Sequence, residues 1–222
     1  MATPTPEAPH ITVRGEARVE AEPETARIGV TLTARGTDRR ATLDDLTRRN
    51  DAALALIQQY DEAVESLETG AFSLTPELTR RNRGERVHAY HGTVHLAATL
   101  HDFTALGELT TRLADLDLTR VDGPWWALRP TSPAYARARR EAVEDAVQRA
   151  RTYARALGTD LDALLELNDT AADMPVPFGG AAPRMAFAAE AAEAAPPLAL
   201  EPQRQTVVAH IDARFTLHPP TL

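Results

Sequence analysis

A chain of 222 residues suits one domain, or one domain with two lobes, and at this size the core needs no disulfide or metal to stabilise it. The formal net charge of −8 disfavours nucleic acid and anionic membranes as partners, because both are negatively charged. The chain has no cysteine, which excludes thiol nucleophiles and Cys-ligated metals, and it has no apolar run of the roughly 18 residues that a membrane span requires.

The N-terminal part of the chain predicts a disordered start and a pair of strands. Residues 1–9 are rich in proline, which is typical of a disordered N-terminus. Apolar residues then alternate with polar ones over 11–21 and 28–34, with a turn at 22–24 between them. Alternation of this kind favours strands with one buried face, so we expect the two strands to form a hairpin.

A helix is predicted after Gly36, with Thr37 and Asp38 as candidate N-caps. Its apolar stripe contains one polar residue, Asn50. The stripe consists of Leu43, Leu46, Asn50, Ala53, Leu54 and Ile57. A single amide on a core face usually needs only a hydrogen-bond partner, so we expect Asn50 to bond to nearby backbone.

A second hairpin is predicted from strands at 64–78 and 87–101, joined by a polar turn at 79–86. This turn holds the densest basic patch of the chain, formed by Arg80, Arg81, Arg83 and Arg86. Guanidinium groups can bind an acidic partner, a phosphate group or the carboxylates of a neighbouring subunit. Charge runs more often form a solvated turn, so the four arginines are a candidate partner-contact surface and no more.

Four histidines, His88, His91, His95 and His101, fall in the same segment. On a strand His91 and His95 would stand about 13 Å apart, at roughly 3.3 Å per residue. One zinc ion holds its ligands at about 2 Å, so these two residues cannot share it. We therefore predict exposed histidines on a strand face and no metal site.

The next segment predicts a helix capped by Asp102 and then a strand at 118–128. The helix carries Phe103, Leu106, Leu109 and Leu113 on one side. Trp125 and Trp126 are neighbours on the strand, so their side chains point to opposite faces. We expect one in the core and one at the surface. The outward one could anchor an interface, but packing under the Ala-rich third helix or the 170–203 loop is the favoured alternative.

A third helix begins at Ser132-Pro133 and runs to Leu157, where Gly158 supplies a left-handed stop. Alanines recur at every fourth position of this helix, at residues 138, 142, 146, 150 and 154. Such a row forms a smooth ridge, which lets the helix lie close to a sheet or to another helix.

The C-terminal part predicts a short strand or apolar edge at 161–167, a flexible Ala/Pro-rich loop at 170–203, a strand at 207–217 and a tail at 218–222. The element order is thus β-β-α-β-β-α-β-α-β-loop-β. This order favours an α+β fold with an antiparallel or mixed sheet and helices packed on one face, as one unit or as two lobes.

Several local signatures match one family in order and spacing. They are ITVRGEARVEAEPETARIGVTL, with Gly15, Pro23 and Ala26, the third helix ARARREAVEDAVQRARTYARALG, the segment LDALLELND and the closing strand TVVAHIDARFTL. Together they resemble the SIMPL-domain family, a domain of unknown function also seen in bacterial periplasmic immunogenic proteins, and they define a SIMPL-like domain at 10–217. The chain departs from the family at Asp61-Glu62-Ala63, where a glycine is usual.

The resemblance implies an α+β protein of a family whose members are often exported and in some cases form ring-like or channel-like oligomers. It also implies a stress- or signalling-related role. No catalytic residues are established for the family, so none carries over. The N-terminus has no visible signal peptide, which predicts a cytoplasmic location, whereas relatives are often periplasmic or secreted.

No motif for catalysis or nucleotide binding is recognisable. The three serines, Ser66, Ser73 and Ser132, lack a nucleophile elbow, and Gly179-Gly180 lacks a phosphate-binding pattern. We therefore expect no catalytic residues and no cofactor, and we interpret the chain as a non-enzymatic binding or assembly module. Its expected partners are further copies of itself, as homo-oligomers, or an unidentified protein.

Two alternatives remain. One is an enzyme or small-ligand binder with an inter-lobe site of Asp, Glu, Arg and His residues. The other is an adaptor that binds an acidic partner or nucleic acid through the arginine turn.

Overall fold

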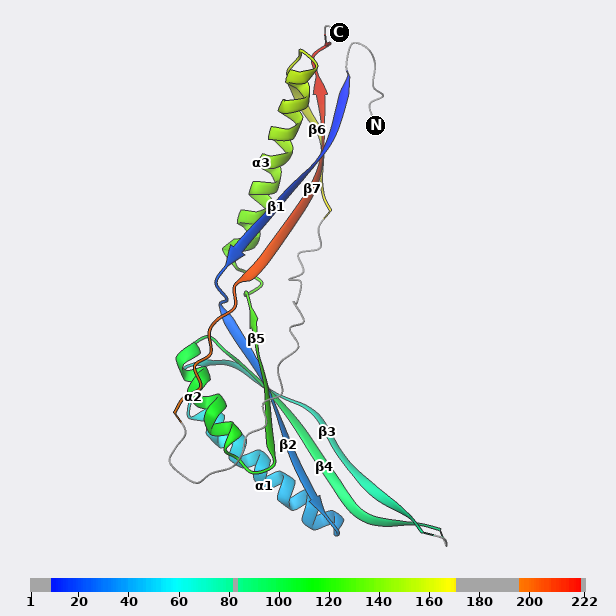
Figure 1. Cartoon of the computed structure of the whole chain (residues 1–222), viewed down its shortest axis with the longest axis vertical. Coiled ribbons are helices and arrows are strands. Elements are labelled where there is room, and N and C mark those ends of the chain that lie inside the picture. Colours follow the sequence, from blue (N-terminus) through cyan, green and yellow to red (C-terminus); the bar gives the residue numbers. More distant parts are fainter. Residues whose placement is uncertain (1–8, 82–83, 171–195, 221–222) are drawn as a thin grey trace. The chain divides into compact units, whose positions relative to one another are not determined.

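The computed structural model of the chain describes residues 9–81, 84–170 and 196–220, with side chains for all of these except 79–86. Ten elements follow one another (Figure 1): β1 (His10–Ala21), β2 (Thr25–Gly36), α1 (Arg39–Gln58), β3 (Val64–Arg81), β4 (Gly84–Leu100), α2 (Phe103–Ala114), β5 (Thr119–Ala127), α3 (Pro133–Ala156), β6 (Leu161–Asp169) and β7 (Gln205–Leu217). The order of strands and helices is the predicted one. The strands form two antiparallel sheets, which confirms the α+β fold. None of the described helices is both long and apolar enough to cross a membrane.

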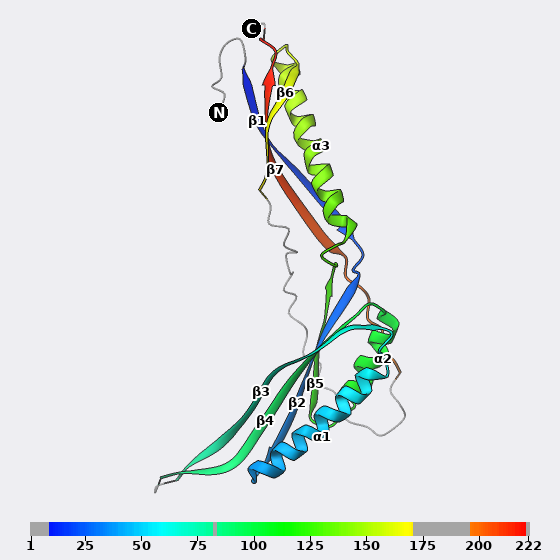
Figure 2. The same ribbon diagram turned by 180° about the vertical axis from the view of Figure 1, so that it is seen from behind.

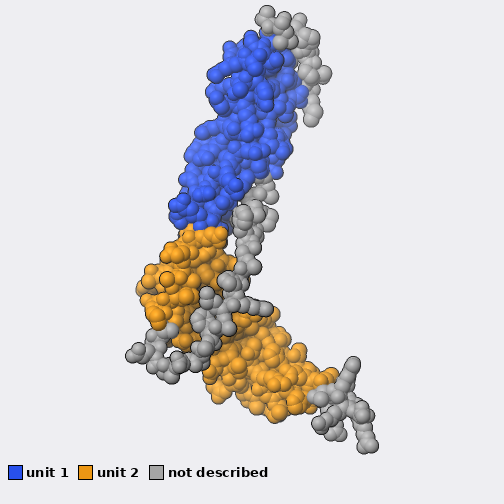
Figure 3. All heavy atoms as spheres, in the orientation of Figure 1, with its two compact units in different colours: residues 1–22, 128–182, 204–222 blue, residues 23–127, 183–203 orange. Residues whose placement is uncertain are grey.

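The described residues divide into two compact units, coloured separately in Figure 3. Unit 1 takes its residues from 1–22, 128–182 and 204–222, and unit 2 takes its residues from 23–127 and 183–203. Each unit has its own sheet and its own cluster of buried apolar side chains. Unit 1 is therefore assembled from stretches that are far apart in the sequence.

Unit 1 consists of a three-stranded sheet, in the order β1-β7-β6, with α3 packed on one face. β1 pairs with β7 along its whole length, from His10 opposite Thr216 to Ala21 opposite Gln205. The apolar residues of β7 alternate as predicted, and every second side chain is buried. This alternation turns one face of β7 toward α3.

Helix α3 has the predicted ends and the predicted packing ridge. The Ser132 hydroxyl accepts a hydrogen bond from the Ala134 amide at 3.3 Å, Pro133 occupies the first turn and Gly158 has a φ of 69°. All five alanines of the ridge are buried: Ala138, Ala142, Ala146, Ala150 and Ala154. Because a methyl group is short, the helix lies very close to the sheet.

The predicted hairpin of β1 and β2 is wrong. β1 pairs with β7 in unit 1, whereas β2 pairs with β4 and β5 in unit 2. The segment around Pro23, interpreted from the sequence as a turn, is where the chain leaves unit 1 for unit 2. Alternation reveals which face of a strand is buried, but it does not identify the partner strand.

Unit 2 consists of a four-stranded sheet, in the order β3-β4-β2-β5, with α1 and α2 on the same face (Figures 1 and 2). Asp38 caps α1 through the Ala41 amide at 2.8 Å, and Asp102 caps α2 through the Thr104 amide at 2.8 Å. The core between helices and sheet is aliphatic. Its fully buried large side chains are Ile28, Val30, Leu32, Ile57, Leu96, Leu100, Leu106, Leu109 and Leu113.

The β3–β4 hairpin is longer than the sequence predicted. β3 continues past Pro76 to Arg81, and the ladder extends to Arg81 opposite Gly84. Proline removes one donor from a ladder, which only an edge strand tolerates, and β3 is an edge strand. Most of the predicted turn is therefore strand.

Two further predictions about single residues have different outcomes. The tryptophans split as expected: Trp126 packs edge-on against Phe103 with ring centroids 4.8 Å apart, whereas Trp125 is 54% exposed. The expected hydrogen bond of Asn50 is not formed, because its buried Oδ1 has no partner among the described residues. Asn50 thus leaves an unsatisfied acceptor at the edge of the unit 2 core.

Most of the loop predicted at 170–203 lies outside the described residues. Its last part, 196–203, is described and lies against α2. The Leu198 amide donates to the Thr111 hydroxyl at 3.0 Å, and Leu200 packs against the core of unit 2. These residues of the predicted loop therefore have a defined place on unit 2.

Candidate functional site

The arginine surface predicted at the β3–β4 turn falls largely outside the described part of the chain. Arg83 lies outside it entirely, and only the backbone of Arg80, Arg81 and Arg86 is described, as the last rungs of the hairpin ladder. The predicted contact surface stays a prediction.

The predicted histidines lie on or beside β4, and the strand spacing separates them. His91 and His95 are four residues apart on one extended strand, and the His95 ring is hydrogen bonded to the Thr31 hydroxyl at 2.9 Å. His101 follows the strand, 3.8 Å from the Glu65 carboxylate. Among the described residues, no three histidine or carboxylate side chains are grouped closely enough to hold a metal ion.

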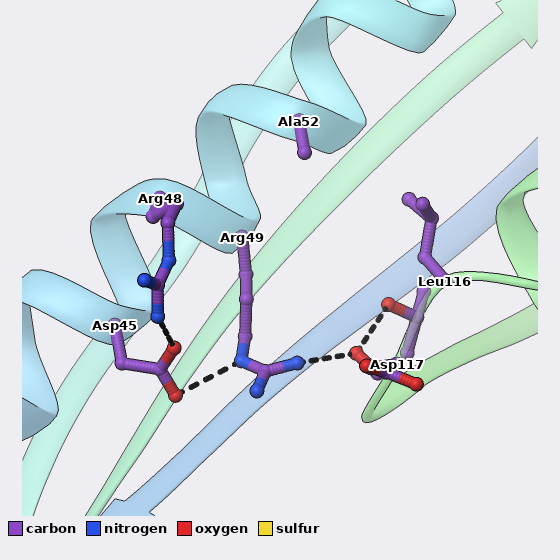
Figure 4. A pocket seen from close by; sticks show the side chains of 7 residues that line it. Asp45, Arg48, Arg49, Ala52, Leu116 and Asp117 are labelled. Atoms are coloured by element: carbon purple, nitrogen blue, oxygen red, sulfur yellow. Dashed lines mark hydrogen bonds and ion pairs between the residues drawn. The ribbon is translucent and has the colours of Figure 1, made fainter.

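A shallow pocket of unit 2 brings together charged residues from α1 and from the segment before β5 (Figure 4). Asp45 bonds to both Arg48 and Arg49, and the Arg49 guanidinium also donates to the Asp117 carbonyl oxygen at 2.8 Å. Hydrogen bonds from Arg48 and then Arg49 lower the pKa of Asp45 below its ordinary value. Because these charges satisfy one another, the cluster ties α1 to the neighbouring loop and offers little to a ligand.

The strand β6 of unit 1 presents apolar side chains at an open edge of its sheet. β6 is an edge strand, and eight of its nine residues are exposed. Three leucines are prominent among them: Leu164 is 54% exposed, Leu165 43% and Leu167 47%. An exposed edge strand with apolar side chains favours pairing with another chain.

The position of α3 explains this exposure. Leu164 stands opposite Phe215, and Leu167 opposite Ala213, so both belong to the face of the sheet that α3 covers elsewhere. The helix packs on β1 and β7 and barely reaches β6. An open groove remains beside it, lined by Val147, Arg151, Leu161, Leu164 and Phe215 among others.

The opposite edge of the same sheet is different. On β1, the Glu16 amide donates to the Asp145 carboxylate of α3 at 2.9 Å, and the Glu20 carbonyl accepts from Arg137 of α3 at 2.8 Å. Side chains of the helix therefore form hydrogen bonds with backbone groups of β1 that would otherwise be open to pairing with a further strand. Of the two edges of this sheet, β6 is the one more open to pairing.

Part of this site was predictable from the sequence. The segment 161–167 was predicted as a strand or an apolar edge, and it is an edge strand. Bulges between Leu161 and Leu164 and between Leu164 and Glu166 bring Leu161, Leu164 and Leu167, which are spaced by three residues, to the same face of the sheet.

Comparison with known proteins adds little about function. The chain is 18% identical to a candidate amidohydrolase/peptidase from Burkholderia cenocepacia, with a TM-score of 0.26. The alignment covers 66% of this chain but only 35% of that protein. The chain is 14% identical to an unknown protein from Galdieria sulphuraria, with a TM-score of 0.19 and coverages of 88% and 84%. At such scores neither likeness bears on fold or function. No protein with a curated description matches.

The sequence profile of one family matches nearly the whole chain, from residue 11 to residue 215. This match confirms the resemblance seen in the sequence. The chain belongs to the SIMPL family, described as proteins of unknown function (DUF541).

Proposed function

We propose that the chain is a self-assembling module in which β6 of unit 1 pairs with β6 of a second copy. The exposed leucine-bearing edge of β6 is the observation that carries this proposal. Covering the exposed parts of three leucines would contribute about 1 kcal/mol each. Pairing would also satisfy the outer backbone groups of β6.

The charges of β6 favour an antiparallel arrangement with a two-fold axis. The strand carries Asp162, Glu166 and Asp169 and no basic residue. A register centred on Leu165 places Asp162 opposite Asn168, Glu166 opposite Leu164 and Asp169 opposite Leu161 of the other copy. No two carboxylates then stand directly opposite, which avoids the repulsion of like-charged cross-strand pairs.

Two-fold symmetric pairing is also the commonest way in which identical chains associate. It would join two three-stranded sheets into one sheet of six strands and bring the two grooves beside β6, which are lined by both charged and apolar side chains, to the same interface. Assembly of this kind needs no cofactor and uses none of the charged clusters described above.

Light scattering coupled to size-exclusion chromatography tests the proposal. The wild-type chain should run at twice its 24.1 kDa mass at micromolar concentrations. A variant with Leu164→Glu and Leu167→Glu should run as a monomer, because it adds two charges to a desolvated surface. A control with Leu78→Glu and Val87→Glu, which alters two exposed apolar residues of unit 2, should stay dimeric.

A wild-type monomer at these concentrations would overturn the proposal. A dimer that survives the β6 substitutions, or one lost in the hairpin control, would place self-association elsewhere and equally reject β6 as the interface. Circular dichroism of each variant distinguishes loss of the dimer from loss of the fold.

A further inference from the structure

The sheet of unit 2 has one face without a helix. On this face β2 presents Arg27, Gly29 and Thr31, and β4 presents His95 and Ala97, each half-buried or exposed. Among the described residues, no helix or strand packs over them. The face is separate from β6, which belongs to unit 1.

A hollow of about 690 Å³ lies on this open face. The hollow is formed by a row of residues that are paired across the four strands. Asp122 of β5 stands opposite Gly29 of β2. Gly29 stands opposite Ala97 of β4, and Ala97 stands opposite Glu68 of β3. The two central residues carry no side chain beyond a methyl group, so they form a low floor. The two carboxylates stand at either side, about 14 Å apart at roughly 4.8 Å per strand.

Trp125 supplies an aromatic wall to the hollow. A Cβ on Gly29 would meet the far edge of the Trp125 indole at 3.3 Å, and one on Gly123 would meet the same indole at 3.4 Å. The indole therefore rests on two glycines, and a Cβ on Gly29 would require it to shift by a few tenths of an ångström. More than half of Trp125 remains exposed, unlike Trp126, which packs against Phe103.

The polar groups around the indole include both donors and acceptors. Arg120 is held by Asp122, at 2.9 and 2.7 Å, and Thr31 by His95 at 2.9 Å. Arg27 and Glu68 also line the hollow and form no hydrogen bond or ion pair with a described residue. Two arginines and two carboxylates balance in charge, so the hollow suits a neutral ligand with many hydroxyl groups.

We propose that this hollow binds a neutral oligosaccharide, with the apolar face of one sugar ring stacked on Trp125 and hydroxyl groups of successive rings bonded to Asp122 and Glu68. A sugar ring offers an apolar face of C–H groups for the indole and hydroxyls that donate to carboxylates and accept from guanidinium groups. The volume of the hollow is in the range of small-molecule sites. A phosphorylated ligand is disfavoured by the net charge of −8.

The two tryptophans provide a direct readout, because each contributes one indole N–H signal to the NMR spectrum of the 222-residue chain. Trp125→Phe assigns the two signals. Cellohexaose, N-acetylchitohexaose, maltohexaose and mannohexaose are titrated separately. At least one should move the Trp125 signal in a saturable manner and leave the Trp126 signal in place.

Trp125→Ala should weaken binding of that sugar about tenfold or more, as loss of an aromatic stacking partner does elsewhere. Trp125→Phe should restore part of the affinity, and Glu68→Gln should weaken binding several-fold. Tyr153→Ala is the matched control, since Tyr153 is an aromatic residue of similar exposure (57%) in unit 1, and it should bind like wild type.

Three results would overturn the proposal. The first is that none of the four sugars moves the Trp125 signal. The second is that binding is unchanged in Trp125→Ala. The third is that poly-L-proline moves the signal while the sugars do not, which would identify a peptide site. The β6 variants lie in the other unit, so failure of self-association would leave this experiment unaffected.

Discussion

Gly15 of β1 lies directly beneath Ala146 of α3, so closely that a Cβ on Gly15 would stand 2.7 Å from the Ala146 Cβ and would overlap the carbonyl oxygen of Ala142. The contact involves helix backbone, which cannot rotate away as a long side chain can. The smallest residue on the strand and the alanine ridge on the helix therefore depend on each other.

Gly15→Ala should accordingly destabilise unit 1. We expect a loss of about 1–3 kcal/mol, the usual cost of overpacking. Urea denaturation followed by circular dichroism measures it. Gly70→Ala is the control, because a Cβ there meets no atom closer than 3.6 Å, and its stability should equal or slightly exceed that of wild type. Equal stability of the two variants would contradict the close packing of α3.

Gly107 of α2 lets the segment 196–203 lie against the helix, because it has no Cβ at the point of contact. A Cβ on Gly107 would stand 2.6 Å from the Leu198 carbonyl oxygen, so Gly107→Ala should release this segment although alanine favours a helix by about 1 kcal/mol. Hydrogen exchange of the Leu198 amide, which donates to Thr111, should become faster. Thr111→Val removes the acceptor of this amide directly and should also accelerate its exchange. Unchanged exchange in Gly107→Ala would contradict the contact.

Asp45 should make stability depend on pH in the acid range. Its pKa is lowered by Arg48 and Arg49 in the folded chain, so its stabilising effect is present above the ordinary value of 3.8 and is lost as pH falls through the lowered pKa. Asp45→Asn should cost about 0.5–1 kcal/mol at neutral pH and progressively less at about pH 3 and below. Denaturant titrations at both pH values measure the difference. Asp44→Asn, a substitution at an exposed neighbour, is the control and should keep wild-type stability at neutral pH.

Asn50 should be replaceable by leucine without loss. Its buried Oδ1 has no partner among the described residues, so Asn50→Leu removes an unsatisfied acceptor and adds apolar contact with the core. We expect a gain of about 1 kcal/mol in the free energy of unfolding. Asn50→Ala, which removes the acceptor but leaves space, serves as the comparison. A loss of stability in Asn50→Leu would indicate that an ordered water molecule bonds the amide.

Local patterns in the sequence predicted the elements well. Asp102, Ser132 and Gly158 mark helix ends through chemistry that acts within a few residues, and alternation marks the strands. Pairing is different, because Arg14 reaches its partner Asp212 across 198 positions. No local signal reports such a contact, and the hairpin predicted from β1 and β2 failed for this reason.

The candidate surfaces were predictable only in part. The leucines of β6 indicated an apolar edge, but their exposure depends on where α3 lies on the sheet. The hollow beside Trp125 depends on Gly29 and Ala97 facing each other across two strands, which is a matter of register. Both surfaces arise from tertiary placement, which the residue pattern of any single segment does not contain.

The full pairing of β1 with β7 has a consequence for synthesis of the protein. Strand β1 receives its partner only when β7 has been translated, whereas most of unit 2 is translated before β7. In the nascent chain β1 therefore stays unpaired while unit 2 folds. The completion of unit 1 is a late and slow step, because it depends on pairing between strands that are far apart in the sequence. Premature termination before residue 205 would leave α3 without β7, the strand that provides most of the buried apolar side chains on which the helix packs.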